Sequence, residues 1–114
     1  MTETLSDEDR KLVVLARGAL ARAESPSGAA VRDGDGRTYA GADVRTRSLT
    51  LTGLQVAVAS AISSGARSFE AAVVVNGDAG DPGLDTLHEL SPEAYAVLTD
   101  LAGRPQQRLG RADA

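Results

Sequence analysis

The sequence contains no cysteine and no tryptophan, and it contains one histidine. Without cysteine the chain can form no disulfide, supply no thiolate metal ligand and offer no thiol nucleophile. With one histidine, a zinc site built by the protein alone would need mainly carboxylate ligands. We therefore predict no metal site and no other cofactor. Aromatic residues make up only 3% of the chain, so we expect a core of Ala, Val and Leu.

The chain also lacks a concentration of positive charge. Its net charge is −4, its pI is near 4.9, and its 12 basic residues are scattered along the sequence. This distribution predicts no binding to nucleic acid or to anionic lipid. The opening MTETLSDEDR is acidic and polar, and no run approaches the roughly 18 apolar residues of a membrane span. We expect no membrane segment and a cytoplasmic location.

The first half of the chain indicates a helix followed by a hairpin. Ser6 and Asp9 have capping-box spacing, and apolar residues recur behind them at helical intervals, so we expect an amphipathic helix over residues 7–23. The sequence GAAVRDGDGRTYAGADV then predicts two strands, at about residues 28–33 and 37–44, around a DGDG turn.

The next segment indicates a helix packed on a central strand. A Thr/Ser-rich loop at residues 45–52 leads into a helix that Thr52 caps and Gly65 ends. The continuous apolar run at residues 69–75 predicts a strand covered on both faces. We expect Val73–Val75 of this strand to pack against residues 56–62 of the helix.

The last third predicts a short helix from Pro82, a strand at residues 94–100 and a frayed polar tail at residues 105–114. The remaining residues, 1–104, are long enough for one domain with its own core. The alternation of helices and strands predicts an α/β fold, a three-layer α/β/α sandwich around a small mixed sheet.

Four segments occur in an order that is known from one family. They are SGAAV at residues 27–31, DGRTYAGADVRTRS at 35–48, GLQVAVASAISSG at 53–65 and AAVVV at 71–75. In this order the chain resembles the cytidine deaminase family over roughly residues 10–104. The family's segments are VGAA, G-x-N-V-E-N-A-S, a C-A-E that opens the second helix and a P-C-x-x-C that opens the third. The resemblance implies the same α/β/α sandwich.

The departures from the family lie at its reactive positions. In the family, zinc held at the starts of the second and third helices activates water, and a glutamate moves the proton. The counterparts here are Gly53, and Gly83 and Leu84 or their near neighbours; neither Gly nor Leu carries a ligand atom. Gln55 replaces the glutamate and cannot shuttle a proton at neutral pH. The resemblance therefore implies a degenerate member without a zinc site and without zinc-dependent deamination.

The ribose-binding segment of the family has also changed. N-V-E-N is replaced here by Asp43, Val44, Arg45 and Thr46, so a vestigial substrate pocket would contain Asp43, Arg45 and Gln55. Two of these residues also have a structural interpretation. A carboxylate at a strand end usually binds loop amides, and a polar side chain in a first helical turn is usually satisfied by nearby backbone.

We interpret the chain as a catalytically inactive interaction or scaffold domain for a protein partner that the sequence does not name. Relatives of this fold generally form dimers or tetramers through the second helix and the loop before it. The resemblance thus implies a homo-oligomer with Leu49 and Leu51 in its interface. Alternatively, these leucines fold back over the vacated active site. Two other functions stay open: a sensor for a nucleoside-like small molecule, and an active enzyme.

Overall fold

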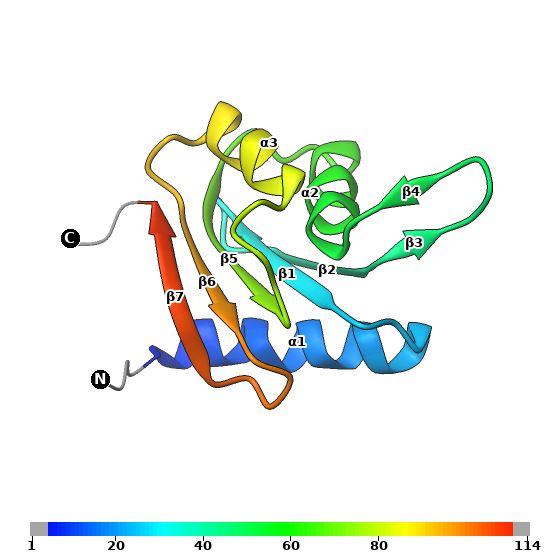
Figure 1. The fold of residues 1–114 in the computed structure, drawn as a ribbon. Coiled ribbons are helices and arrows are strands. Elements are labelled where there is room, and N and C mark those ends of the chain that lie inside the picture. Colours follow the sequence, from blue (N-terminus) through cyan, green and yellow to red (C-terminus); the bar gives the residue numbers. More distant parts are fainter. Residues whose placement is uncertain (1–4, 111–114) are drawn as a thin grey trace.

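The computed structural model describes residues 5–110, which form a layered α/β fold (Figure 1). In chain order the elements are α1 (Asp7–Ala23), β1 (Gly28–Asp33), β2 (Thr38–Ala42), β3 (Val44–Arg45), β4 (Thr50–Leu51), α2 (Gly53–Ser63), β5 (Phe69–Val75), α3 (Pro82–Leu90), β6 (Tyr95–Thr99) and β7 (Pro105–Gly110). Within these residues no helix has the length and apolar character needed to cross a membrane.

Five strands form one mixed sheet in the order β2-β1-β5-β6-β7. The β5–β6 pair is parallel, and the other three pairs are antiparallel. Helix α1 lies on one face of this sheet, and α2 and α3 lie on the other (Figure 1). The predicted three-layer α/β/α sandwich around a small mixed sheet is confirmed.

The ends of α1 and the β1–β2 turn follow from local chemistry. The Ser6 hydroxyl accepts a hydrogen bond from the Asp9 backbone N–H at 3.1 Å and caps the helix. In the DGDG turn, the buried Asp33 carboxylate accepts from the backbone N–H groups of Asp35 and Arg37, both at 2.9 Å. Burial alone would raise the pKa of Asp33, but these bonds and one from the Tyr39 hydroxyl outweigh it and hold the pKa below its ordinary value. The segment is a hairpin turn, as predicted.

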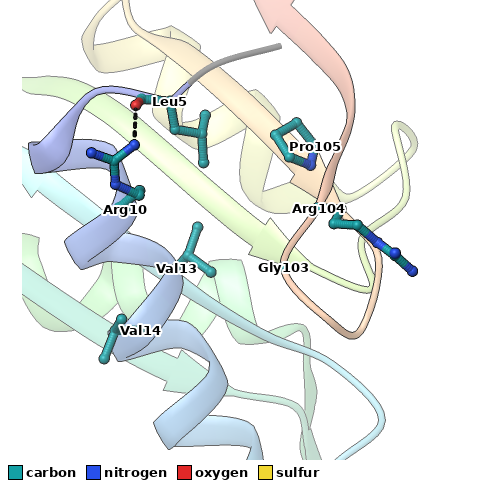
Figure 2. A pocket seen from close by; sticks show the side chains of 7 residues that line it. All are labelled: Leu5, Arg10, Val13, Val14, Gly103, Arg104 and Pro105. Carbon is teal, nitrogen blue, oxygen red and sulfur yellow. Dashed lines mark hydrogen bonds between the residues drawn. The ribbon is translucent and has the colours of Figure 1, made fainter. Parts of the chain in front are cut away.

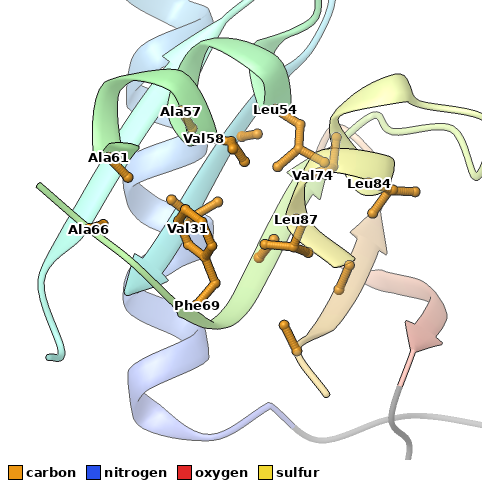
Figure 3. Close-up of a cluster of buried hydrophobic side chains, with 14 of the residues drawn as sticks. Val31, Leu54, Ala57, Val58, Ala61, Ala66, Phe69, Val74, Leu84 and Leu87 are labelled. Atoms are coloured by element: carbon orange, nitrogen blue, oxygen red, sulfur yellow. The ribbon is translucent and has the colours of Figure 1, made fainter. Parts of the chain in front are cut away.

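The core has two halves, because successive residues of β5 face opposite sides of the sheet. Val74 belongs to the half covered by α2 and α3, which Figure 3 shows together with Leu54 and Leu84. Val73 and Val75 belong to the half covered by α1. The expectation that all three valines pack against α2 is therefore wrong for two of them.

Two segments differ from the sequence prediction. Residues 105–110 form the edge strand β7 rather than a frayed tail, paired with β6 after a turn in which Asp100 accepts from the Arg104 N–H at 2.8 Å. Residues 111–114 lie outside the described residues. The segment expected as a strand at 37–44 and a loop at 45–52 is instead β2 followed by the small β3–β4 hairpin.

A polar cluster joins the start of α1 to the sheet. The Asp9 carboxylate, only 3% exposed as a residue, accepts from the Tyr95 hydroxyl at 2.8 Å and from Arg32 Nη1 at 3.2 Å. Arg32 Nε also donates to Glu70 at 2.7 Å. Burial lowers the pKa of Arg32, but the bonds to Glu70 and Tyr95 and the charge of Asp9 outweigh it and leave the pKa above its ordinary value. Burial and the bond to Asp9 raise the pKa of Tyr95. The cluster is built around a buried Asp9–Arg32 ion pair, with further hydrogen bonds to Tyr95 and to the more exposed Glu70.

Candidate functional site

The candidate site lies where the N-termini of α2 and α3 meet. At the start of α2, the Thr52 hydroxyl oxygen accepts from the Gln55 backbone N–H at 3.0 Å, and the Gln55 side-chain oxygen accepts from the Thr52 N–H at 2.9 Å. The two residues thus form a capping box. The side-chain oxygen of Gln55 is used by the backbone, while its Nε2 has no hydrogen-bond partner among the residues that the structure describes.

Asp81 connects the two helices. Its Oδ1 accepts from the Gly83 N–H at 2.8 Å and so caps α3, with Pro82 at the first helical position. The same oxygen accepts from the Thr52 hydroxyl at 2.7 Å. One carboxylate therefore stabilises both helix N-termini, where the partial positive charges of the helix dipoles meet.

The two helices also touch directly at Gly83. A Cβ at this position would lie 2.7 Å from Leu54 Cγ and 2.9 Å from the Gln55 backbone nitrogen. Leu54 itself is fully buried, and Figure 3 shows it close to Leu84 of α3. Gly53 is similarly enclosed, because a Cβ there would lie 3.0 Å from the Gly41 carbonyl oxygen. The space at the helix junction is filled by protein atoms.

The residues at this junction do not fit the zinc ion that the family resemblance implies. Counted from Pro82, the spacing P-C-x-x-C falls on Gly83 and on Thr86, which is one of the near neighbours of Gly83 and Leu84 expected from the sequence. Neither glycine nor threonine belongs to the ligand types of structural or catalytic zinc. Among the described residues, no three His, Cys, Asp or Glu side chains gather closely enough to hold a metal ion. No reaction step through zinc follows from this arrangement.

The contact at Gly83 gives a direct test of how tightly the junction is packed. We expect Gly83→Ala to destabilise the protein by about 1–3 kcal/mol, because the added methyl group meets Leu54 and the backbone of Gln55. Thermal unfolding followed by circular dichroism measures the change. Gly80→Ala is the matched control, since a Cβ there meets only the Asp78 carboxylate at 3.6 Å or beyond. Equal stabilities for the two variants would contradict a filled junction.

Asp43 has a structural role beside the start of α2. Its Oδ1 accepts from the Gly53 backbone N–H at 2.8 Å, and both carboxylate oxygens lie 2.9 Å from the Ser27 hydroxyl. Its own backbone N–H donates to Ser25 Oγ at 3.2 Å. Asp43 thus holds the end of β2, the start of β1 and the start of α2 together. The bond from the Gly53 N–H is a backbone amide contact of the kind that the structural interpretation of Asp43 names, whereas Ser27 donates from its hydroxyl.

Asp43 and Arg45 share a surface hollow, whereas Gln55 does not contribute to it. The hollow has a volume of about 290 Å³ and is also lined by Ala23, Glu24, Ser25 and Pro26. Arg45 is exposed, without an ion pair to any described residue. The structure therefore brings together two of the three residues expected in a vestigial pocket. It places Gln55 in the helix cap instead.

The two leucines expected in an interface lie in the β3–β4 hairpin, which projects away from the sheet (Figure 1). Leu49 is 49% exposed, and Leu51 is half-buried beside the start of α2. Thr46 closes the turn of this hairpin, because its backbone N–H donates to the Leu49 carbonyl at 2.8 Å.

Sequence reasoning missed Asp81, the residue that connects the two helices. The sequence does contain a signal for its capping role, since an Asp followed by Pro is typical of a helix N-cap and first helical position. Its bond to Thr52 joins residues 29 positions apart. A sequence pattern carries no information on that contact.

Comparisons with known proteins agree with the fold. The family model described as cytidine deaminase-like matches residues 5–103. The cytidine deaminase of Burkholderia pseudomallei superposes with a TM-score of 0.77 at 23% identity, covering 93% of each chain. That of Mycobacterium tuberculosis gives 0.68 at 22% identity, covering 90% of this chain and 91% of its own. That of Mycobacterium leprae gives 0.66 at 25% identity, covering 90% and 93%.

A search of curated proteins finds no match. The family model covers most of the chain, and the three solved deaminases share its fold over 90% or more of its length. The chain belongs to the cytidine deaminase-like family.

Proposed function

We propose that this protein is a catalytically inactive member of its family that acts as an interaction or scaffold domain. The observation that carries the proposal is the direct contact between the N-termini of α2 and α3. Asp81 joins the two helices through Thr52, and Gly83 packs against Leu54. Gln55, at the position of the family's proton-transferring glutamate, is part of a helix cap and cannot act as a general acid or base at neutral pH.

The outer surface of α2 supports a role in protein contacts. No charged residue occurs from residue 48 to residue 66, a stretch that contains all of α2. The exposed positions on this helix are small or apolar: Ala59, Ser60, Ile62 and Ser63. A solvent-facing helix normally carries charge on its outer face, and depletion of charge is typical of interface cores.

We further propose that the protein self-associates through this surface and the adjoining β3–β4 hairpin. Leu49 is 49% exposed, which favours an intermolecular contact over folding back across the α2–α3 junction. Ile62, on the same uncharged stretch, is 41% exposed. A closed dimer buries the same surface on both copies and is the minimum assembly that does so.

The double variant Leu49→Ser/Leu51→Ser tests this interface. By sedimentation equilibrium at micromolar concentration, we expect the parent protein to have the mass of two or four chains of 11.7 kDa. The variant is expected to shift toward one chain, because the serines remove the apolar area that association buries. Circular dichroism checks that the variant is folded, and Leu49→Ser alone avoids the half-buried position.

Leu101→Ser is the matched control for this experiment. Leu101 is 56% exposed, and it follows β6 rather than lying on the hairpin. Its replacement is expected to leave the assembly unchanged. A parent protein with the mass of a single chain would contradict self-association, and an effect of Leu101→Ser equal to that of Leu49→Ser would place the interface elsewhere.

A second candidate function is the binding of a nucleoside-like ligand. It rests on the hollow of about 290 Å³ in which Asp43 supplies an acceptor and Arg45 a donor. Against it, both carboxylate oxygens of Asp43 already bind Ser27. A thermal-shift panel of nucleosides and nucleobases separates the two functions. A ligand at 100 times its Kd would stabilise the fold by about 2.7 kcal/mol, whereas an interaction domain without the ligand site would show no shift.

A further inference from the structure

An apolar cleft lies on the opposite side of the molecule from the α2–α3 junction. It is formed by the beginning of α1 and by the turn between β6 and β7 (Figure 2). Its volume is about 430 Å³, within the range of small-molecule sites. The lining residues are Leu5, Arg10, Val13, Val14, Gly103, Arg104 and Pro105.

The topology explains why the cleft is there. Helix α1 packs against β1, β2 and β5, while the other face of the sheet is covered by two helices. A helix is about 10 Å wide and strands are about 4.8 Å apart, so one helix cannot cover five strands. On the β6–β7 side of this face, Leu5 and the turn at Gly103 lie beside α1, and a Cβ at Gly103 would lie 2.7 Å from Val13 Cγ1. The space beyond this contact is the cleft.

The floor of the cleft is aliphatic, and its titratable side chains are cationic. Val14 is 70% exposed, the highest exposure among the large hydrophobic side chains of the described residues. The two ionisable residues in the lining are Arg10 and Arg104, although the whole chain has a net charge of −4. An apolar surface beside a guanidinium is complementary to a molecule with an alkyl chain and an anionic end.

Arg10 is the cation placed to receive that anionic end. Its Nη1 donates to the Leu5 carbonyl at 2.8 Å, which holds the guanidinium at the rim of the cleft (Figure 2). Its other contact is an exposed ion pair with Asp7, which leaves further N–H donors of the guanidinium open. The Arg104 side chain extends away from the cleft in Figure 2 and pairs with Asp100 at 3.0 Å.

We propose that this cleft binds an alkyl carboxylate, with a chain of about ten carbons on the floor formed by Leu5, Val13, Val14 and Pro105, and the carboxylate against Arg10. The proposal is independent of the proposed interaction function, because the cleft shares no residue with the α2 surface or the hairpin. The site holds its ligand by apolar burial and by one charge-assisted hydrogen bond, with no covalent step.

The test is a titration of the full ¹⁵N-labelled chain with decanoate, followed by NMR. We expect saturable shifts of the amides of Leu5, Val13, Val14 and Gly103, at one decanoate per chain. Each buried methylene contributes roughly fourfold in affinity, so hexanoate should bind at least about tenfold more weakly. Decanol, which lacks the charge, should bind at least about fivefold more weakly than decanoate.

Two variants and one control complete the experiment. Val14→Asp, at an exposed position, should weaken decanoate binding more than about tenfold, and Arg10→Gln should make decanoate and decanol bind equally. Leu90→Ser alters a different hollow and should leave the affinity unchanged. Each spectrum shows directly whether the variant is folded. The proposal is overturned by an absence of saturable shifts, by shifts centred on other residues, by equal binding of decanol to the parent protein, or by full affinity in folded Val14→Asp.

Discussion

Replacing Val74 by aspartate is expected to unfold the protein at room temperature. Val74 is 2% exposed in the central strand β5, paired with Ala29 of β1 and Leu98 of β6. An aspartate there would place an unpaired carboxylate among aliphatic side chains, at a cost of several kcal/mol. The whole free energy of unfolding of a domain this size is typically about 5–15 kcal/mol. One-dimensional NMR and thermal unfolding measure the outcome.

Val14→Asp is the matched control for Val74→Asp. It makes the same chemical change on α1 at a side chain that is 70% exposed, so the carboxylate stays hydrated. Its effect on stability is expected to be within about 0.5 kcal/mol. A cooperative transition of Val74→Asp near the melting temperature of the parent protein would contradict the placement of β5 in the core.

The second large effect is expected from Arg32→Met, which removes the cation of the buried pair with Asp9. The Arg32 and Asp9 side chains are 11% and 5% exposed. The variant leaves the Asp9 carboxylate buried with the Tyr95 hydroxyl as its remaining side-chain donor. Leaving one partner of a buried pair uncompensated costs about 3–5 kcal/mol. In thermal unfolding we expect the melting temperature to fall by roughly 10 °C or more.

The cluster offers its own controls. Glu70→Gln removes the outer partner of Arg32, a carboxylate that is 52% exposed, and should change stability by less than about 1 kcal/mol. The double variant Arg32→Met/Asp9→Asn should recover part of the loss, because it removes the uncompensated charge as well. If Arg32→Met lowers the stability no more than Glu70→Gln does, the Asp9–Arg32 pair does not stabilise the packing of α1 on the sheet.

The elements with strong local signals were predicted from the sequence. The helix at Asp7–Ala23 and the strands at Gly28–Asp33 and Phe69–Val75 have the predicted bounds, because caps, turn residues and apolar runs act within a few residues of one another. The strand at Pro105–Gly110 was missed because its residues are polar and mostly exposed. It is a strand because β6 provides backbone partners, and that partnership is nonlocal.

The sequence predicts which reactive groups the candidate site lacks, but it does not predict the contacts that the site makes. The sequence shows that Gly53 and Gly83 lack ligand atoms and that Gln55 cannot act as a proton shuttle. It does not show that Gly83 lies against Leu54, nor that Asp81 binds Thr52. These contacts depend on how two helices meet across the sheet. Periodicity and capping signals do not determine that arrangement.

The measurement that tests the central claim most directly is zinc content combined with deamination. The protein is purified from cells grown with added zinc, and the cytidine deaminase of Mycobacterium tuberculosis is prepared in parallel as the positive control. Elemental analysis is expected to find less than about 0.1 zinc per chain, because no three His, Cys, Asp or Glu side chains gather among the described residues to complete a zinc site. Cytidine is expected to be converted to uridine no faster than in a sample without protein. About one zinc per chain together with uridine formation would contradict the account.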